Sequence, residues 1–110
     1  MAKSKIETYL GFCIRAGKII FGTDNIEKER KGIYLLLVDG GIGKNSLKLM
    51  ERAKEKFACP MLQTEMEALG ELLYRPAVKA VAITDKNLAS AILSVAESEP
   101  QFKLYSGGCN

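Results

Sequence analysis

Hydrophobic positions recur along the chain with two different periods, which predict two kinds of element. Spacings of three and four residues predict a first helix whose apolar face is formed by Ile6, Leu10, Cys13 and Ile14. Ser4 and Glu7 form a capping box at the start of this helix, and Gly17 ends it. The same spacing predicts helices at residues 45–57, 65–73 and 85–96, and a capping box that begins at Thr64 precedes the second of these. Asp24 and Glu27 repeat the capping pattern and predict a helix at residues 24–31.

Short apolar runs bounded by glycine, proline or polar turns predict strands at residues 19–21, 33–38, 59–63 and 80–84. Pro60, near the start of the third run, places that strand near an edge of the sheet. Five helices that alternate strictly with four strands imply an α/β protein in which helices enclose a sheet. We expect one domain over residues 1–100. Residues 101–110 form a short C-terminal tail that either docks through Phe102, Leu104 and Tyr105 or frays.

The stretch from residue 10 to residue 32 contains a second glycine turn, at Gly22, which precedes a strongly polar helix. Such a helix is either mostly solvated or covered by a polar partner. Its unpaired backbone N–H groups suit an anionic ligand, and the polar side chains beside them could recognise the edge of a base. Thr23, Asp24 and Asn25 stand at this position, and the expected ring of cations around the turn consists of Arg15, Lys18 and Lys28.

Charge is distributed unevenly along the 110 residues, although the net charge is only +3. Residues 1–56 hold 12 Lys or Arg and 7 Asp or Glu, whereas residues 57–110 hold 4 and 6. This division favours a polyanion-binding face on the first half of the chain. Charge alone does not distinguish such a face from a solvated surface on which the cations cluster by chance.

Several classes of protein are disfavoured by the sequence. The chain has no His and three widely spaced Cys, so neither a metal site nor a disulfide framework is expected, and Cys13 and Cys59 are interpreted as core residues. No apolar run approaches the length of a membrane span, and residues 1–10 lack the apolar core of a signal peptide, so we expect a cytoplasmic protein.

A glycine-rich loop at residues 40–46 is similar to a phosphate-binding loop but departs from it at two positions. Val38 replaces the first glycine, and Asn45 follows Lys44 where the motif requires Ser or Thr. Asp39 and Asp85, which follow strands, are interpreted as helix-capping or turn residues. We therefore expect no cofactor and no enzymatic activity. A nucleotide-binding enzyme that uses this loop is the weaker alternative.

An ordered set of short motifs covers residues 5–95 and resembles one protein family. These motifs are Leu10-Gly-x-x-x-Arg15-Ala-Gly-Lys18, Gly22, Lys28, the run LLLVDGG, Cys59-Pro60, Ala68-Leu-Gly70 and Ala80-Val-Ala-Ile-Thr-Asp85. Together they resemble the kink-turn-binding ribosomal proteins of the L-seven-Ae and L-thirty-e family, including its small bacterial members. The resemblance implies a three-layer α/β/α sandwich with a four-stranded mixed sheet. It also implies binding to structured RNA, often a kink-turn with tandem sheared G·A pairs.

In that family the start of the second helix enters the RNA groove, and the matching residues here are Gly22, Thr23, Asp24, Asn25 and Lys28. The family usually has Asn followed by Glu where this chain has Asp24 followed by Asn25. Asp24 therefore either accepts hydrogen bonds from a base or caps the helix, and Asn25 either contacts a base or sugar or faces solvent. Lys28 suits a phosphate.

The family's second contact is the loop before the last strand, here residues 74–79. Tyr74 replaces a common glycine and either stacks on a base or fills the core. Ala77 and Val78 are the expected apolar contacts, with phosphates bound by Arg75, Lys79 and Lys18. Arg15 either flanks the same groove or lies along the core.

The expected partner is therefore structured RNA, rRNA or a kink-turn, with the ribosome as a further partner and with neither a membrane nor a small-molecule substrate. A protein-binding adaptor on the same fold is the alternative.

Overall fold

The computed structural model describes residues 5–30 and 32–105. Along this part of the chain helices and strands alternate as follows: α1 (Lys5–Ala16), β1 (Ile19–Phe21), α2 (Thr23–Lys28), β2 (Leu35–Val38), α3 (Lys44–Phe57), β3 (Met61–Thr64), α4 (Ala68–Leu73), β4 (Ala80–Ile83), α5 (Lys86–Ala96) and β5 (Phe102–Leu104). The predicted N-cap Ser4, Lys31 and residues 106–110 of the tail lie outside the described residues. The α/β class and the alternation of elements are confirmed.

The strands form one five-stranded mixed sheet in the order β1-β4-β2-β3-β5. β2 and β3 are parallel, whereas the pairs β1–β4, β2–β4 and β3–β5 are antiparallel. The parallel pair needs a crossover, which α3 supplies. β4, late in the sequence, lies between β1 and β2, so it pairs with two strands from the first half of the chain.

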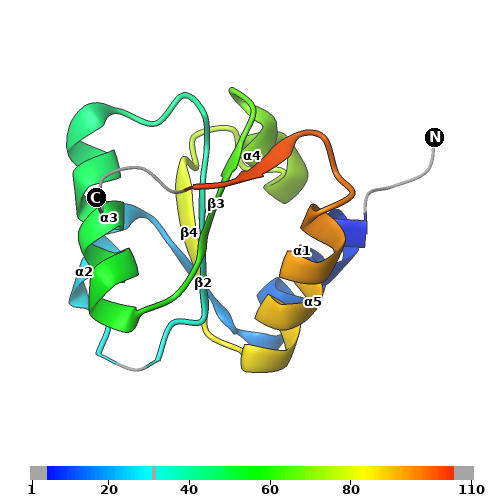
Figure 1. Cartoon of the computed structure of the whole chain (residues 1–110), viewed down its shortest axis with the longest axis horizontal. Coiled ribbons are helices and arrows are strands. Elements are labelled where there is room, and N and C mark those ends of the chain that lie inside the picture. The colour runs from blue at the N-terminus through cyan, green and yellow to red at the C-terminus, as the bar shows by residue number, and fades with distance from the viewer. Residues whose placement is uncertain (1–4, 31, 106–110) are drawn as a thin grey trace.

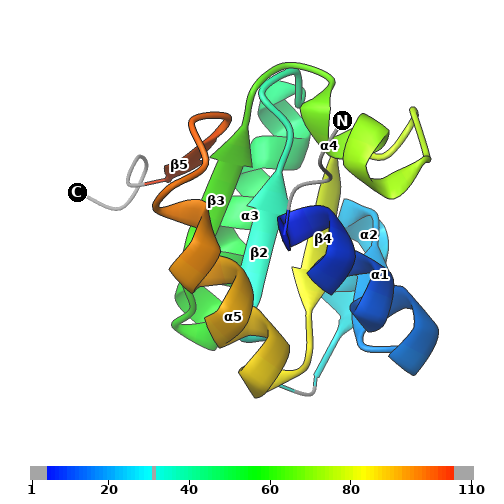
Figure 2. The same cartoon turned by 90° about the vertical axis from the view of Figure 1, so that its right-hand side faces the viewer.

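Helices cover both faces of the sheet (Figure 1), with α1, α4 and α5 on one side and α2 and α3 on the other. Figure 2, turned by 90°, shows α1 and α5 in front of the strands. Because successive side chains of a strand point to opposite faces, β2 contributes to two cores. Leu35 and Leu37 pack with α1 and α5, whereas Leu36 and Val38 pack with α2 and α3.

The expectation of four strands was one short, because part of the predicted tail is β5. Phe102 is buried, and its strand pairs with β3, so that Leu62 lies opposite Leu104. Gln101, Phe102, Lys103 and Leu104 alternate as in a strand, but the run of three strand residues after Pro100 is too short to be distinguished from a tail by local pattern. β3 is consequently an inner strand, and the edge position expected from Pro60 was wrong. Pro60 precedes the strand, and its carbonyl accepts from the N–H of Leu36.

Three details of the helices also differ from the prediction. α2 begins at Thr23 with Gly22 as its N-cap and ends at Lys28, so Asp24 does not cap it. The capping box at Thr64 was wrong, because Thr64 belongs to β3 and Glu67 precedes α4 in a left-handed conformation. Ile14 is 36% exposed because it stands at the border of the apolar face of α1.

No helix in the described ranges, 5–30 and 32–105, combines the length and the apolar character needed to cross a bilayer.

Gly11 of α1 and Gly70 of α4 are both helical but differ in what surrounds them. A Cβ added at Gly11 would meet nothing within 4 Å outside its own helix. At Gly70 it would lie 3.0 Å from the carbonyl oxygen of Arg75 and 3.0 Å from Cα of Pro76. These neighbours are backbone atoms, so they cannot move aside cheaply. The loop that follows α4 therefore folds back closely against the helix because residue 70 lacks a side chain.

We predict opposite effects from the same substitution at the two glycines. Gly11→Ala is expected to raise the free energy of unfolding by about 0.5–1 kcal/mol, because alanine loses less backbone entropy in a helix. Gly70→Ala is expected to lower it by about 1–3 kcal/mol, because the added methyl group overpacks the loop. Urea unfolding of the two variants and the unsubstituted protein measures both. Equal stability of the two variants would contradict the close contact at Gly70.

Candidate functional site

The two segments that the sequence singled out as contacts lie side by side at one end of the sheet. Phe21, the last residue of β1, is opposite Val81 of β4, and the N–H of Gly22 donates to the carbonyl of Ala80 at 3.0 Å. The turn at residues 21–25 therefore adjoins the loop at residues 74–79, which leads into β4. We call these two segments the paired loops. The guanidinium of Arg75 lies 4.6 Å from the centre of the Phe21 ring and links them directly.

The turn at Gly22 has a backbone that favours glycine, with φ of 87°, and leaves the start of α2 without a side-chain cap. Asp24 is exposed, and its carboxylate has no hydrogen-bond or ionic partner in the described part of the chain. The side-chain amide of Asn25 donates to the carbonyl of Phe21 at 3.0 Å. Asn25 thus stabilises the turn with its NH₂ group, and its amide oxygen is left as an acceptor. Thr23, half-buried, stands between these side chains and Gly22.

The loop at residues 74–79 begins with a residue in an unusual conformation. Tyr74 ends α4 with φ of 57°, a left-handed value that glycine adopts more easily. Its hydroxyl donates to the carboxylate of Glu7 on α1, so the side chain points toward α1 and not toward the turn at Gly22. The hydrogen bond to Glu7 and the negative charge of that carboxylate raise the pKa of Tyr74. Tyr74 is 74% exposed, so it does not fill the core.

The remaining side chains of this loop have different environments. Ala77 is exposed, whereas Val78 is half-buried and packs against the core beneath α1 and α5. Pro76 is exposed, and the N–H of Arg75 donates to the carbonyl of Gly70 at 2.9 Å. The backbone of the loop is therefore held against α4, and Arg75 and Ala77 present side chains to solvent.

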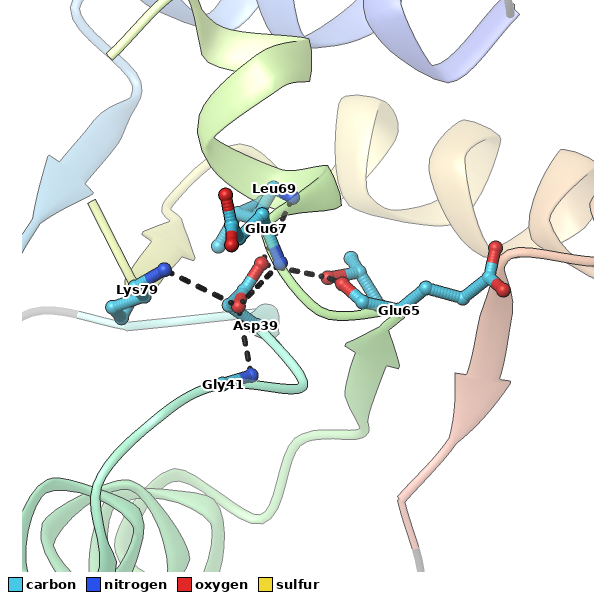
Figure 3. A network of polar contacts seen from close by, with 7 residues as sticks. Asp39, Gly41, Glu65, Glu67, Leu69 and Lys79 are labelled. Atoms are coloured by element: carbon cyan, nitrogen blue, oxygen red, sulfur yellow. Dashed lines mark hydrogen bonds and ion pairs between the residues drawn. The ribbon is translucent and has the colours of Figure 1, made fainter. Parts of the chain in front are cut away.

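Asp39 holds the neighbouring loops in place from the inside (Figure 3). Its carboxylate is fully buried and accepts hydrogen bonds from three backbone N–H groups, those of Gly41, Glu67 and Leu69, at 2.8, 2.9 and 3.1 Å. The hydroxyl of Thr64 lies 3.3 Å from the same carboxylate. Leu69 belongs to the first turn of α4, so Asp39 caps that helix from 30 residues away in the sequence.

Lys79 of the paired loops completes this network. Its ammonium nitrogen lies 3.5 Å from the Asp39 carboxylate, and the lysine side chain is 36% exposed. Burial by itself raises the pKa of Asp39. Hydrogen bonds from the N–H groups of Glu67, Gly41 and Leu69, together with the charge of Lys79, outweigh burial, so the pKa lies below its ordinary value. The ion pair with Asp39 thus partly neutralises Lys79 and reduces its availability to an external anion.

The expected ring of cations around Gly22 is only partly present. Lys28 is exposed in the last turn of α2, one helical turn from Asp24. Lys18 precedes β1, at the opposite end of that strand from Gly22, which at 3.3 Å per residue separates their Cα atoms by about 13 Å. The Arg15 guanidinium lies 5.0 Å from the centre of the Phe12 ring on the outside of α1. The paired loops therefore bring together Arg75 and Lys79, whereas Lys28 lies at the other end of α2 from Gly22 and neither Lys18 nor Arg15 joins them.

The sequence did not predict how many backbone groups Asp39 would bind. Its interpretation as a capping and turn residue is confirmed, as is that of Asp85, which accepts from the N–H of Leu88 at 2.9 Å. The helix that Asp39 caps was not foreseen. A carboxylate directly after four buried strand residues was the available signal, because such a position is costly for a charge unless several donors surround it.

Other chemistry is sparse in the described residues. No group of three or more His, Cys, Asp or Glu there could hold a metal ion. Burial is the main cause that raises the pKa of Cys13, to about 11, and of Cys59, so both thiols stay protonated at neutral pH. Their interpretation as core residues is confirmed.

Comparison with known proteins identifies a shared fold. No family model matches the sequence, and no curated protein matches it. A solved structure described as that of a protein with unknown function from Bacillus halodurans C is similar, with a TM-score of 0.74 and 14% sequence identity. The similarity covers 84% of this chain and 97% of that one. At this level of identity the similarity shows the fold alone.

We predict that Asp39→Asn lowers the free energy of unfolding at pH 7 by about 3 kcal/mol, because the amide NH₂ group would face backbone donors and Lys79 would lose its partner. The folded-state pKa of Asp39 is depressed, so its contribution is present above the unfolded-state pKa of about 3.9 and is lost as the pH falls through the folded-state value. The variant should therefore lose less stability than the unsubstituted protein when the pH is lowered below about 4. Urea unfolding across this pH range measures both effects.

Asp85→Asn provides the control, because it changes an ordinary N-cap and is expected to cost about 1 kcal/mol or less. Equal losses for the two variants at pH 7 would contradict the central position of Asp39.

Proposed function

We propose that this protein binds structured RNA, a kink-turn or a folded rRNA segment, through the paired loops. The observation that carries the proposal is the adjacency of residues 21–25 and 74–79, fixed by the Gly22–Ala80 hydrogen bond and the Arg75–Phe21 contact. These segments lie about 50 residues apart in the sequence; the charge and turn pattern pointed to the first, and the family resemblance implied both as contacts with RNA. Their meeting at one end of the sheet is what a single continuous binding surface requires.

The side chains divide into two roles. Arg75 and Lys28 are exposed cations suited to phosphates, which position a protein on RNA without reading sequence. Asp24 and Asn25 supply acceptor oxygens suited to base edges, since a guanine presents N–H donors to a carboxylate. α2 has six residues, so its dipole is small and the proposal does not rest on it. Binding is therefore docking onto a shaped surface, without a chemical step.

Three predicted contacts have a smaller part in this proposal. Tyr74 donates a hydrogen bond to Glu7, and Lys79 forms an ion pair with Asp39. Lys18 lies at the end of β1 away from Gly22. The RNA surface thus centres on Gly22, Thr23, Asp24, Asn25 and Arg75, with Lys28 and Ala77 at its margins. Val78 contributes by fixing the loop against the core.

We further propose that the protein is a member of the kink-turn-binding family and acts with the ribosome in the cytoplasm. In that case the helices on both faces of the sheet correspond to the three-layer α/β/α sandwich of the family, to which β5 adds a fifth strand. The split in charge between the two halves of the chain supports a polyanionic partner.

A gel-shift comparison of a kink-turn RNA, a plain hairpin and a duplex, each at low and moderate salt, tests the proposal. Tighter binding to the kink-turn at both salt concentrations is the expected result. Equal, strongly salt-dependent binding to all three RNAs would leave only non-specific electrostatic attraction. Absence of binding to all three would reject the proposal and favour the protein-binding adaptor.

We predict that Lys28→Ala weakens binding to the kink-turn RNA about five- to tenfold and lowers the slope of log K against log salt by about one. Lys28 is exposed and makes no ion pair in the described part of the chain, so the thermal midpoint should change little. Lys86→Ala, which removes an exposed cation at the start of α5, is the matched control and should leave binding unchanged. Unchanged affinity of the Lys28 variant at low salt would remove Lys28 from the surface.

A further inference from the structure

The outer surface of α3 carries a regular row of cations that the proposed function does not use. Its members are exposed and follow one another every four residues: Lys44, Lys48, Arg52 and Lys56. At 1.5 Å per residue they are spaced by about 6 Å along the helix axis, so the row is about 18 Å long. Each step turns about 40° around the axis, so the row winds about 120° over its length, and all four side chains are exposed. We call this row the α3 stripe.

Interactions within the protein do not account for the α3 stripe. Lys44, Lys48 and Arg52 make no ion pair in the described part of the chain. Like charges four residues apart repel each other, and Lys44 lies in the first turn of α3, where the helix dipole disfavours a cation. The stripe therefore costs helix stability slightly and leaves its charge available to a partner.

The carboxylates of α3 do not cancel this charge. Glu51 is half-buried and accepts a hydrogen bond from the hydroxyl of Tyr105, which holds it on the side of α3 that faces the C-terminal segment. Glu55, which lies between Arg52 and Lys56 in the sequence, is the exposed carboxylate of α3. The four cations of the stripe thus outnumber the one exposed carboxylate of the same helix.

The α3 stripe is continuous with the surface proposed to bind RNA. α2 and α3 lie next to each other on the same face of the sheet (Figure 1), and both contribute to the same core cluster. The ammonium of Lys56 donates to the carbonyl of Glu29, just after α2, at 3.1 Å. Glu29 stands between two further exposed cations, Lys28 and Arg30. Lys28, the last residue of α2, and Arg30, just after the helix, therefore lie near the Lys56 end of the stripe.

We propose that the α3 stripe binds the phosphate backbone of a stem that flanks the RNA site held by the paired loops. This inference rests on the proposed function and extends its footprint by the length of α3. A row of cations at even spacing that winds about 120° around the helix suits the regular phosphates of a nucleic-acid strand, which also winds, and carries no sequence information. A phosphate strand presents charge at even spacing whatever its sequence, and the stripe adjoins the proposed RNA surface, so the phosphate backbone is the partner proposed here.

The test compares two kink-turn RNAs, one with flanking stems of about three base pairs and one with both stems extended to about ten base pairs, long enough to reach along α3. The double variant Lys48→Gln/Arg52→Gln removes the centre of the stripe. On the long-stem RNA it is expected to bind about tenfold more weakly than the unsubstituted protein, with a salt slope lower by about one to two. On the short-stem RNA its affinity should be unchanged.

The control is Lys5→Gln/Lys86→Gln, which removes the same charge from α1 and α5 on the opposite face of the sheet. Thermal melts verify folding, and the stripe variant should melt no lower than the unsubstituted protein because it relieves repulsion. Equal weakening by the two double variants would indicate an effect of net charge and overturn the inference.

Unchanged binding of the stripe variant to the long-stem RNA would also overturn it, and is the result expected if an acidic protein occupies α3. The proposed function survives either outcome if Lys28→Ala still weakens binding to the short-stem RNA. If the unsubstituted protein binds neither RNA more tightly than a duplex, the proposed function fails and the inference fails with it.

Discussion

The buried carboxylate of Asp39 is the constraint on which the functional end of this molecule depends. A charge with no exposure to solvent is tolerated only where donors surround it, and here they come from three separate segments. Gly41 follows β2, Glu67 precedes α4, Leu69 lies in its first turn, and Lys79 precedes β4. One side chain therefore fixes the relative positions of three loops, and these loops support the surface on which RNA binding is proposed.

Pairing of β1 with β4 brings the turn at residues 21–25 next to the loop at residues 74–79. The antiparallel register sets Gly22 beside Ala80, and Gly70 lets the loop at residues 74–79 return closely against α4. The conformation of the loop is thus determined at both ends before any ligand is present. A surface held in this way loses little entropy on binding, which favours recognition of a partner with a defined shape. Tyr74 illustrates the same rigidity, since its hydrogen bond to Glu7 ties the loop to α1 as well.

The two faces of the sheet differ in what their helices present to solvent. α2 buries only Ile26, and α2 and α3 together carry six of the 12 cations of residues 1–56, whereas α1 carries Lys5 and Arg15. The contact of Lys56 with the carbonyl of Glu29 joins the ends of these helices, so the charge asymmetry seen in the sequence becomes an asymmetry in space. On the opposite face, α1, α4 and α5 bury a larger apolar cluster beneath their inner sides. The proposed RNA footprint, from the paired loops along α3, lies on the more cationic side.

The sequence by itself determined the α/β class, the order of the helices and strands through α5, and most of the core, because apolar periodicity is a local property of the chain. Ile6, Leu10, Cys13 and the buried residues of β2 and β4 were all evident from it. Only the tertiary structure decided that β5 joins β3, that Asp39 caps α4, and that Arg75 approaches Phe21. Each of these depends on contacts between distant segments, and local spacing carries no information about which loops a strand pairing will bring together.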